Sequence, residues 1–428
     1  MQTAYRAIRV ALLGAGSVGA NVARLMIENK QELAQRVGAE FEIAGILVRD
    51  AHQVRPGVPS ELFTTDAEGL ILSADIVIEL IGGIHPAKEY VELALNSGAD
   101  VITANKALIA AHGPQLFDLA EQLGAQLYYE AAVAGAIPII RPLRESLAGD
   151  KVNRVMGIVN GTTNFILDRM ESTGADFDEA LAEATELGYA EADPTADIEG
   201  YDAASKAAIL ASLAFHSEVP VEKVHREGIT SVTALQMETA REAGYAVKLL
   251  GICERVDDGL VARVHPTLIP LDHPLAAVRG AYNAVFVEAE SAGRLMFYGA
   301  GAGGPQTASA ILGDLVSAAK RHLAGGPGLA DSVHANLEAL PVQRIQTRYQ
   351  ITLQVSDEPG VLASIASVFA EHGVSVETVS QSAATTGAAL LTVMTHRASE
   401  QALEQVVSSL RSKNSVQQIS SVIRVEGM

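Results

Sequence analysis

The spacing of apolar residues in the first third of the chain predicts strands that alternate with helices. Continuous apolar runs, typical of buried strands, lie at 8–13, 41–48, 75–81, 100–103 and 126–130. Segments with helical spacing lie between them at 18–37, 86–96 and 114–123. Strands joined by helices form a parallel sheet covered on both faces, so residues 1–135 are predicted to form a doubly wound, Rossmann-type α/β domain.

The pattern changes after residue 135 and favours a second, α+β domain over 136–323. Strand-like runs lie at 152–159, 260–268 and 284–290, and helices are expected at 176–187, 203–214 and 307–322. Loops are expected at 160–164, 189–201 and 299–304. Asp176 followed by Glu179 is a capping pair for the first of these helices. The helix at 307–322 is expected to complete the first domain.

The C-terminal residues 349–428 form a self-contained pattern after a predicted linker at 324–348. Strands are expected at 350–355, 374–380, 389–395 and 416–425, with helices at 361–372 and 399–411. This order is a βαββαβ, ferredoxin-like unit.

Charge and cysteine content narrow the classes of partner. The formal net charge of −20 disfavours nucleic acid and anionic membranes. Cys253 is the single cysteine, so no internal disulfide forms and a cytoplasmic location is expected. Because long uninterrupted apolar stretches are absent from the sequence, we expect no membrane-spanning helix.

A glycine-rich turn follows the first predicted strand and opens a helix. Its residues are Gly14, Gly16, Ser17, Val18 and Gly19. The first glycine permits a tight turn, the second lets a pyrophosphate approach the backbone, and the third lets helix and strand pack closely. The pattern predicts a dinucleotide-binding site. The alternative interpretation is a glycine turn of an α/β fold that binds no nucleotide.

The second strand ends at Arg49 and Asp50, where the cofactor's ribose is recognised in this fold. Arg49 favours the 2′-phosphate of NADP, and Asp50 leaves NAD possible. A solvated surface arginine is the alternative interpretation of Arg49.

Two groups of polar residues are candidates for the chemistry. Thr103 and Lys106 follow a strand of the first domain, at the sheet edge where ligands bind. Asp202 and Lys206 are spaced to share one helix face and follow the acidic segment 191–199. A lysine can transfer the proton that accompanies hydride transfer to a carbonyl. A surface salt bridge, a helix cap and a surface lysine remain the simpler interpretations.

The order of these motifs resembles homoserine dehydrogenase. The resemblance rests on GAGSVG, TANK, GIVNGTTNFIL, GYAEADPTADIEGYDAASK and GAGAGGPQTAS, at 14–19, 103–106, 157–167, 188–206 and 299–309. The tail resembles an ACT domain, a module that commonly binds amino acids, through DEPGVLASIASVFAEHGV. Together they imply NAD(P)H-dependent interconversion of aspartate 4-semialdehyde and L-homoserine.

The resemblance also implies roles for particular residues. Lys206 would be the acid/base and Lys106 would orient the substrate, with Asp202 beside them. The substrate pocket would include Thr162, Glu191 and Asp197, and the loop with Gly301 and Gly303 would close over the cofactor. A sodium ion would be held by main-chain carbonyls of Glu130, Val133, Gly135 and Ile137.

The ACT-like tail implies feedback by an amino acid, which we expect to be threonine. Gly360 stands at the strand–helix turn where such modules bind ligand, and it is equally compatible with an ordinary turn glycine. ACT-like modules usually pair between chains, so a homodimer or homotetramer is expected.

Two other functions fit parts of the sequence. Aspartate-semialdehyde dehydrogenase needs a cysteine nucleophile, and Cys253, in an apolar run, is the one candidate. A non-catalytic sensor of amino acids would also use a nucleotide domain and an ACT-like tail. The lysine and carboxylate cluster argues against that second interpretation.

Overall fold

The computed structural model describes residues 6–53, 55–257, 259–325, 333–385 and 388–427. The chain divides into two compact units. Unit 1 consists of Met1–Gly161, Ser205–Glu222 and Tyr282–Leu337, and unit 2 consists of Thr162–Ala204, Lys223–Ala281 and Glu338–Met428. None of the helices in the described ranges is long and apolar enough to cross a membrane.

Unit 1 is built on a parallel sheet with the strand order β3-β2-β1-β4-β5-β6. The strands are β1 (Ile8–Leu13), β2 (Phe41–Leu47), β3 (Phe63–Thr64), β4 (Ile76–Glu79), β5 (Asp100–Thr103) and β6 (Leu127–Tyr128). This order, which reverses direction beside β1, confirms the predicted doubly wound sheet. The short strand β3 was not predicted.

The helices beside this sheet are α1 (Ser17–Glu28), α2 (Lys30–Val37), α3 (Ala67–Leu72), α4 (Ala87–Asn96), α5 (Lys106–Leu123) and α11 (Gly304–Ala324). The single helix predicted at 18–37 is in fact two, because Asn29 leaves the helical conformation with φ −103° and ψ 18°. The helix predicted at 114–123 is wrong at its start, since α5 begins at Lys106.

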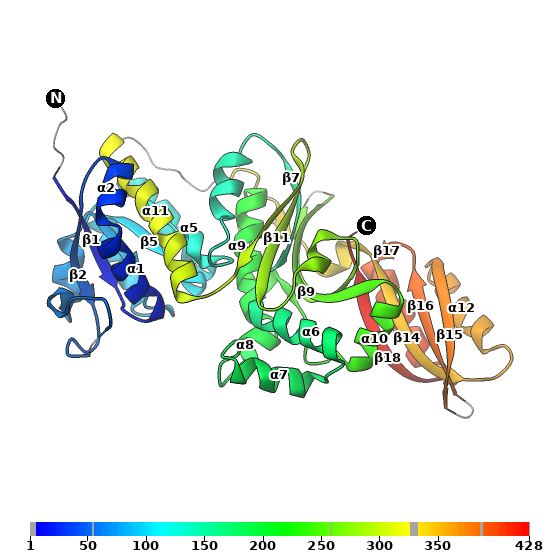
Figure 1. The fold of residues 1–428 in the computed structure, drawn as a ribbon. Helices are drawn as coiled ribbons and strands as arrows, with labels where there is room; N and C mark the ends of the chain where they lie inside the picture. The colour runs from blue at the N-terminus through cyan, green and yellow to red at the C-terminus, as the bar shows by residue number, and fades with distance from the viewer. Residues whose placement is uncertain (1–5, 54, 258, 326–332, 386–387, 428) are drawn as a thin grey trace. The chain divides into compact units, whose positions relative to one another are not determined.

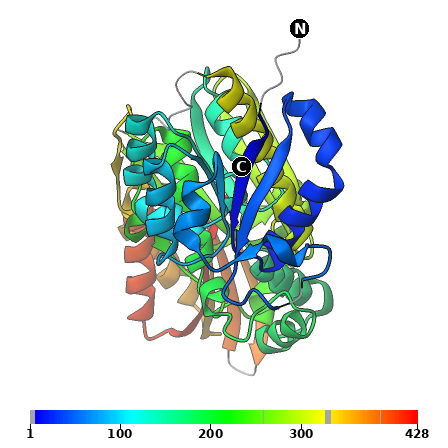
Figure 2. The same cartoon turned by 90° about the vertical axis from the view of Figure 1, so that its left-hand side faces the viewer.

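The helix α11 lies beside α1 and joins the core of the parallel sheet, although it is far away in sequence (Figure 1, and Figure 2 from the side). Its buried residues Ile311 and Leu315 belong to the same apolar cluster as Val10 and Leu12 of β1. Unit 1 also contains an antiparallel trio, β7 (Val152–Ile158), β11 (Tyr282–Ala289) and β12 (Gly293–Ala300). Strand β12 was not predicted.

Unit 2 contains the helices α6 (Gly161–Thr173, whose first residue belongs to unit 1), α7 (Phe177–Glu186), α8 (Thr195–Ile198) and α10 (Ala234–Glu242). The predicted capping pair is confirmed, because Asp176 and Glu179 exchange both hydrogen bonds at the start of α7. The loop predicted at 160–164 is wrong from Gly161 onward. Those residues begin α6, in which Thr163 and Asn164 are buried and Asn164 donates to the Gly280 carbonyl oxygen at 2.8 Å.

The long antiparallel pair β9 (Tyr245–Val256) and β10 (Gly259–Pro270) is the centre of unit 2. Its flanking segments are β8 (His225–Arg226) and β13 (Glu338–Ala339), which both pair with β10. Part of the predicted linker is therefore structured: Leu340, Val342 and Ile345 pack against Val261. Residues 326–332 of that linker lie outside the described residues.

The C-terminal elements are β14 (Gln346–Ser356), α12 (Val361–Glu371), β15 (Val376–Thr385), β16 (Ala388–Thr395), β17 (Ala398–Ser399), α13 (Glu400–Arg411) and β18 (Val416–Val425). They form an antiparallel sheet in the order β18-β14-β16-β15, as predicted for a βαββαβ unit. Strand β18 also pairs in parallel with β10 through Thr267 and Arg424. The C-terminal sheet is thus continuous with the strands of unit 2.

Candidate active site

The glycine turn between β1 and α1 has the geometry of a dinucleotide-binding turn. Gly14 has φ +110°, and its N–H donates to the carbonyl oxygen of Leu47 at 3.0 Å. A Cβ on Gly19 would lie 2.2 Å from the Gly14 carbonyl oxygen, so only glycine lets helix and strand approach this closely. A Cβ on Gly16 would have no described atom within 4 Å, which leaves room for a phosphate.

The loop with Gly301 and Gly303 leads to a second helix start beside this turn. A Cβ on Gly304, the first residue of α11, would lie 2.8 Å from the Ser17 Oγ. Val18, also in the predicted turn, packs on the apolar core. Two helix N-termini therefore lie together, and their free N–H groups and positive partial charges suit an anionic cofactor.

Two arginines lie at the end of β2. Arg49 is exposed, two residues beyond the strand. Sequence reasoning missed Arg55, whose Nε donates to the Ala15 carbonyl oxygen at 3.1 Å inside the glycine turn. Its guanidinium also lies 4.9 Å from the centre of the Phe63 ring. A loop arginine has no sequence signal, because only the folded loop places it at the turn.

The carboxyl ends of β4 and β5 hold a second polar group. Thr103 donates its hydroxyl to the buried Glu79 at 2.6 Å, and Glu79 also accepts from the Ile81 N–H at 2.7 Å. Asn105 caps α5 by accepting from the Leu108 N–H at 3.1 Å. Lys106 is the first residue of that helix and is exposed. Glu79 was not predicted, because it continues an apolar strand and carries no motif.

The segment proposed to hold sodium is compact and lies against the Gly301 loop. Ala134 and Gly135 have positive φ, and a Cβ on Gly135 would lie 2.4 Å from the Gly301 carbonyl oxygen. Val133 and Ile137 are buried. No cluster of three or more His, Cys, Asp or Glu side chains suited to a metal occurs among the described residues. A cation in this segment would therefore depend on main-chain carbonyl oxygens, which suit hard cations.

The Glu130 side chain is already committed to other partners. Its carboxylate accepts from the Ile139 and Ile140 N–H groups at 2.6 and 2.8 Å and pairs with Arg141 at 3.0 Å. The Glu130 N–H donates to the buried Asp314 at 2.9 Å. Burial raises the pKa of Asp314 to about 7, against the opposing effect of Arg141. This cluster fixes the main chain of the segment from Glu130 onward.

Lys206 is buried, with 9% of its surface exposed, and lies on α9 (Tyr201–Phe215). Its ammonium donates to the Val159 carbonyl oxygen at 2.7 Å, just beyond the end of β7. Asp202, one helical turn earlier, is also buried. The burial contradicts the interpretation of these residues as a surface salt bridge, because an exposed pair would be solvated on both partners.

The other predicted substrate residues belong to unit 2. Thr162 donates its hydroxyl to the Tyr189 carbonyl oxygen at 2.7 Å, which ties the start of α6 to the acidic segment. Glu191 is exposed in that segment, and Asp197 is half-buried within α8.

Sequence reasoning also missed Lys248, a fully buried lysine of β9. It donates to the Asn164 Oδ1 at 3.2 Å and to the Val278 carbonyl oxygen at 2.6 Å. Burial lowers the pKa of Lys248 to about 8, while Asp168 and Glu171 act in the opposite direction. A lysine within an apolar strand run is the one signal that the sequence offers for this position.

Cys253 lies in β9 and is buried, and burial raises the pKa of its thiol to about 12. A thiol that stays protonated at neutral pH is a poor nucleophile, so it does not suit the thioester chemistry of aspartate-semialdehyde dehydrogenase.

The parallel sheet with its glycine turn and the βαββαβ tail define a nicotinamide-dependent oxidoreductase with a C-terminal ACT domain. Family models support each part: the NAD-binding domain of homoserine dehydrogenase matches residues 14–130, homoserine dehydrogenase itself matches 138–316, and the ACT domain matches 349–413. The chain therefore belongs to the homoserine dehydrogenase family.

Curated relatives agree over nearly the full length. The homoserine dehydrogenase of Corynebacterium glutamicum is 54% identical, with 98% of this chain and 96% of the relative covered. That of Mycobacterium tuberculosis is 52% identical, with 98% of both chains covered. The non-catalytic sensor is thereby ruled out in favour of an NAD(P)-dependent oxidoreductase.

Solved structures share the fold. A homoserine dehydrogenase from Thiobacillus denitrificans has a TM-score of 0.93 at 39% identity, covering 99% of both chains. A hyperthermophilic archaeal homoserine dehydrogenase in complex with NADPH has a TM-score of 0.63 at 28% identity. It covers 75% of this chain and 99% of its own.

Proposed function

We propose that this chain reversibly reduces L-aspartate 4-semialdehyde to L-homoserine, a step toward threonine, methionine and isoleucine. The observation that carries the proposal is the buried Lys206 ammonium, held 2.7 Å from the Val159 carbonyl oxygen within the segment that resembles the family. A bound nicotinamide supplies the hydride in one direction and accepts it in the other.

Lys206 is the proton donor to the aldehyde oxygen as negative charge develops there. Its hydrogen bond to Val159 holds the ammonium in one position before substrate arrives, which limits the reorganisation needed during reaction. Lys106 orients the substrate and adds positive charge, and Asp202 lies one turn from Lys206 on α9. Glu191 binds the substrate ammonium, with Thr162 and Asp197 shaping the pocket.

Arg49 and Arg55 are proposed to favour NADP, because Arg49 follows the strand end where this fold recognises the ribose and Arg55 bonds the Ala15 carbonyl oxygen of the glycine turn. NAD remains a second possible cofactor through Asp50. The carbonyl oxygens of Glu130, Val133, Gly135 and Ile137 are proposed to hold a sodium ion. Its role would be to keep this segment in place against the Gly301 loop.

The ACT domain is proposed to bind an amino acid, threonine in the first instance, and to lower activity. Gly360 has φ +92° at the start of α12, and this strand–helix turn is the proposed binding site. We also propose a cytoplasmic location and a homodimer or homotetramer, in which ACT domains pair.

The experiment is the absorbance at 340 nm with aspartate 4-semialdehyde and NADPH or NADH, with and without threonine. Oxidation of NADPH, faster than of NADH, is expected from the two arginines. Failure to oxidise either cofactor would refute the reaction. Unchanged rates in threonine would refute feedback by that amino acid while leaving the reaction intact.

A further inference from the structure

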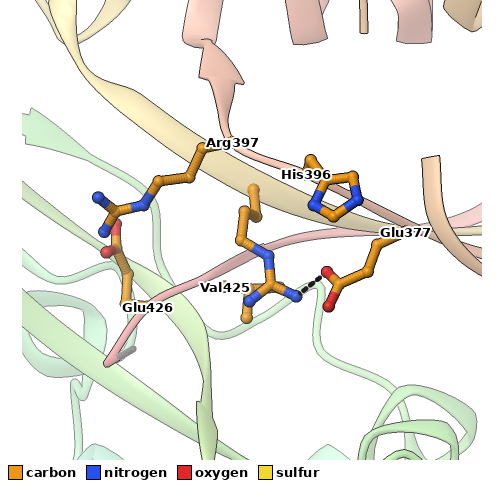
Figure 3. A pocket seen from close by; sticks show the side chains of 6 residues that line it. Glu377, His396, Arg397, Val425 and Glu426 are labelled. Atoms are coloured by element: carbon orange, nitrogen blue, oxygen red, sulfur yellow. Dashed lines mark hydrogen bonds and ion pairs between the residues drawn. The ribbon is translucent and has the colours of Figure 1, made fainter. Parts of the chain in front are cut away.

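Glu79, the last residue of β4, is a fully buried carboxylate held by uncharged donors. Charged side chains inside unit 2 are held differently, by opposite charges. Arg263 pairs with the buried Glu426 at 2.7 Å, and Arg348 pairs with Glu377, as the dashed line in Figure 3 marks. Because a buried carboxylate without an opposite charge depends on its hydrogen bonds, the donors around Glu79 identify what this residue holds in place.

Glu79 lies at the edge of the parallel sheet where a ligand is expected. Strands β1 and β4 are neighbours, and the strand order reverses between them. In open α/β sheets, ligands bind outside the carboxyl ends of the strands at such a reversal. Glu79 is in register with Leu13, just before the glycine turn, on one side and with Thr103 of β5 on the other. It therefore lies between the glycine turn and the segment that begins at Thr103.

One oxygen of this carboxylate fixes the loop after β4. The Oε1 atom accepts from the Ile81 N–H at 2.7 Å and from the Gly82 N–H at 3.2 Å. Gly82 and Gly83 have φ of +78° and +73°, so the chain leaves the strand direction directly beyond the carboxylate. The two hydrogen bonds hold this turn of the chain against the end of the strand.

The other oxygen reaches the loop after β5. The Oε2 atom accepts from the Thr103 hydroxyl at 2.6 Å, and that hydroxyl in turn accepts from the Asn105 N–H at 2.9 Å. The Asn105 Nδ2 then donates to the Gly83 carbonyl oxygen at 2.6 Å. Glu79, Thr103, Asn105 and Gly83 thus form a closed set of hydrogen bonds, the edge network, which joins the two loops.

The edge network also sets where α5 begins. The Asn105 Oδ1 accepts from the Leu108 N–H at 3.1 Å and caps this helix, whose first residue is Lys106. The main chain of Lys106 is therefore fixed relative to the loop after β4. Hydride transfer requires its reacting groups to be aligned closely, and a displacement of about 1 Å can lower the rate by about 10²-fold.

We propose that Glu79 is a positioning residue for hydride transfer. Through the edge network it holds the loop after β4 and the start of α5 in one arrangement, at the edge where nicotinamide and substrate meet. The inference rests on the proposed function, because the role of Lys106 in orienting the substrate is taken from it. A purely structural role for Glu79 would lower stability and leave the kinetic constants of the folded enzyme unchanged.

The first test is Glu79→Gln, measured with aspartate 4-semialdehyde and NADPH. The amide keeps one oxygen for Ile81 and Gly82, but its NH₂ group cannot accept from the Thr103 hydroxyl. We expect kcat to fall by about 10²-fold while the Kd for NADPH, measured by fluorescence, stays near that of the wild type. The primary isotope effect on kcat, with NADPH deuterated at the transferred C4 position, should be no smaller than in the wild type.

Asn105→Ser is the second test, and it decides the matter if Glu79→Gln fails to fold. Serine still caps α5, so the melting temperature should stay near that of the wild type, whereas the bond from Nδ2 to Gly83 is lost. The kcat should again fall at an unchanged Kd for NADPH. Glu121→Gln, at an exposed position of the same helix, is the matched control and should keep all constants.

Three results would overturn the proposal. The first is a wild-type kcat in the folded variants, which would leave the proposed reaction intact because the wild type remains active. The second is a loss of activity that follows a weaker Kd for NADPH and disappears at saturating cofactor. The third is a smaller isotope effect than in the wild type, which would place the loss in product release instead of the hydride step.

Discussion

Several polar residues of this protein are buried and have fixed hydrogen-bond partners. Glu79, Lys206, Lys248 and Asp314 are all almost wholly removed from solvent, yet each has hydrogen-bond partners. Leaving a buried polar group without partners costs about 1–3 kcal/mol, so such residues are retained only where their partners are fixed. The burial of these residues is therefore explained by their hydrogen-bond partners and not by their positions in the sequence.

Lys206→Ala is expected to lower kcat by about 10²–10⁴-fold, because the aldehyde oxygen loses its proton donor. The dissociation constant for NADPH, measured by fluorescence, should stay near that of the wild type, because the cofactor's phosphates are expected at the glycine turn whereas the Lys206 ammonium bonds the Val159 carbonyl oxygen. Lys320→Ala, at an exposed position of α11, is the control. A variant with kcat within tenfold of the wild type would exclude Lys206 as the acid/base.

Asp314→Asn is expected to change how stability depends on pH. Because the folded-state pKa of Asp314 is raised from 3.8 to about 7, its protonated form favours folding. That contribution is complete below the unfolded pKa and is lost as pH rises toward about 7. In the variant, the free energy of unfolding should fall less between pH 4 and 7, by up to about 1.4 kcal/mol per pH unit.

Denaturant unfolding at several pH values measures this slope in both proteins. Equal slopes would show that Asp314 ionises normally in the folded state. The prediction tests the buried cluster around Glu130 without reference to any bound ion.

At the scale of elements, the periodicity of apolar residues predicted whether a segment is a helix or a strand better than it predicted where that segment begins and ends. The strands β1, β2, β4 and β5 were predicted almost to the residue, because buried parallel strands are continuous apolar runs. Helix starts were harder. Helix α5 begins at Lys106, before its predicted start at 114, and α6 begins within a segment expected to be a loop. At both starts a buried asparagine bonds a distant main-chain carbonyl oxygen: Asn105 that of Gly83 and Asn164 that of Gly280.

The glycines of the first turn provide a matched pair of variants. Gly19→Ala should lower the free energy of unfolding by about 1–3 kcal/mol, because its Cβ would lie 2.2 Å from the Gly14 carbonyl oxygen. Gly16→Ala meets no described atom within 4 Å and should fold normally, but should bind NADPH about tenfold more weakly. The melting temperature and the NADPH affinity of each variant separate the two effects. A stable Gly19→Ala variant together with a destabilised Gly16→Ala variant would contradict the geometry of the turn.

At the scale of the whole molecule, the ACT domain is not a separable appendage of unit 2. Strand β18 pairs with β10, and Arg424 bonds both Glu400 of the ACT domain and Glu227 beyond β8. Deletion of residues 349–428 would remove Arg424, the partner of Glu227, and would also remove the strand that pairs with β10. Point variants in the ACT domain are therefore a cleaner test of regulation than truncation.

Glu426→Gln is expected to lower the free energy of unfolding by about 3 kcal/mol, near the lower end of the range for breaking a buried ion pair. Arg263 pairs with the carboxylates of Glu254 and Glu426, and the variant keeps the pair with Glu254 alone. Glu404→Gln, at an exposed position of α13, should change stability by well under about 1 kcal/mol. Similar denaturant midpoints for the two variants would show that the Arg263–Glu426 pair does not stabilise the fold.

The sequence by itself determined the fold class, the dinucleotide turn and the lysine-bearing segments, because apolar periodicity and glycine requirements are local properties of the chain. Only the tertiary structure decided which polar residues are buried and with what partners. Arg55 reaches the Ala15 carbonyl, Lys248 bonds Asn164, and Asp314 bonds Glu130 across long sequence separations. Such contacts depend on how distant segments pack, so local sequence patterns do not predict them.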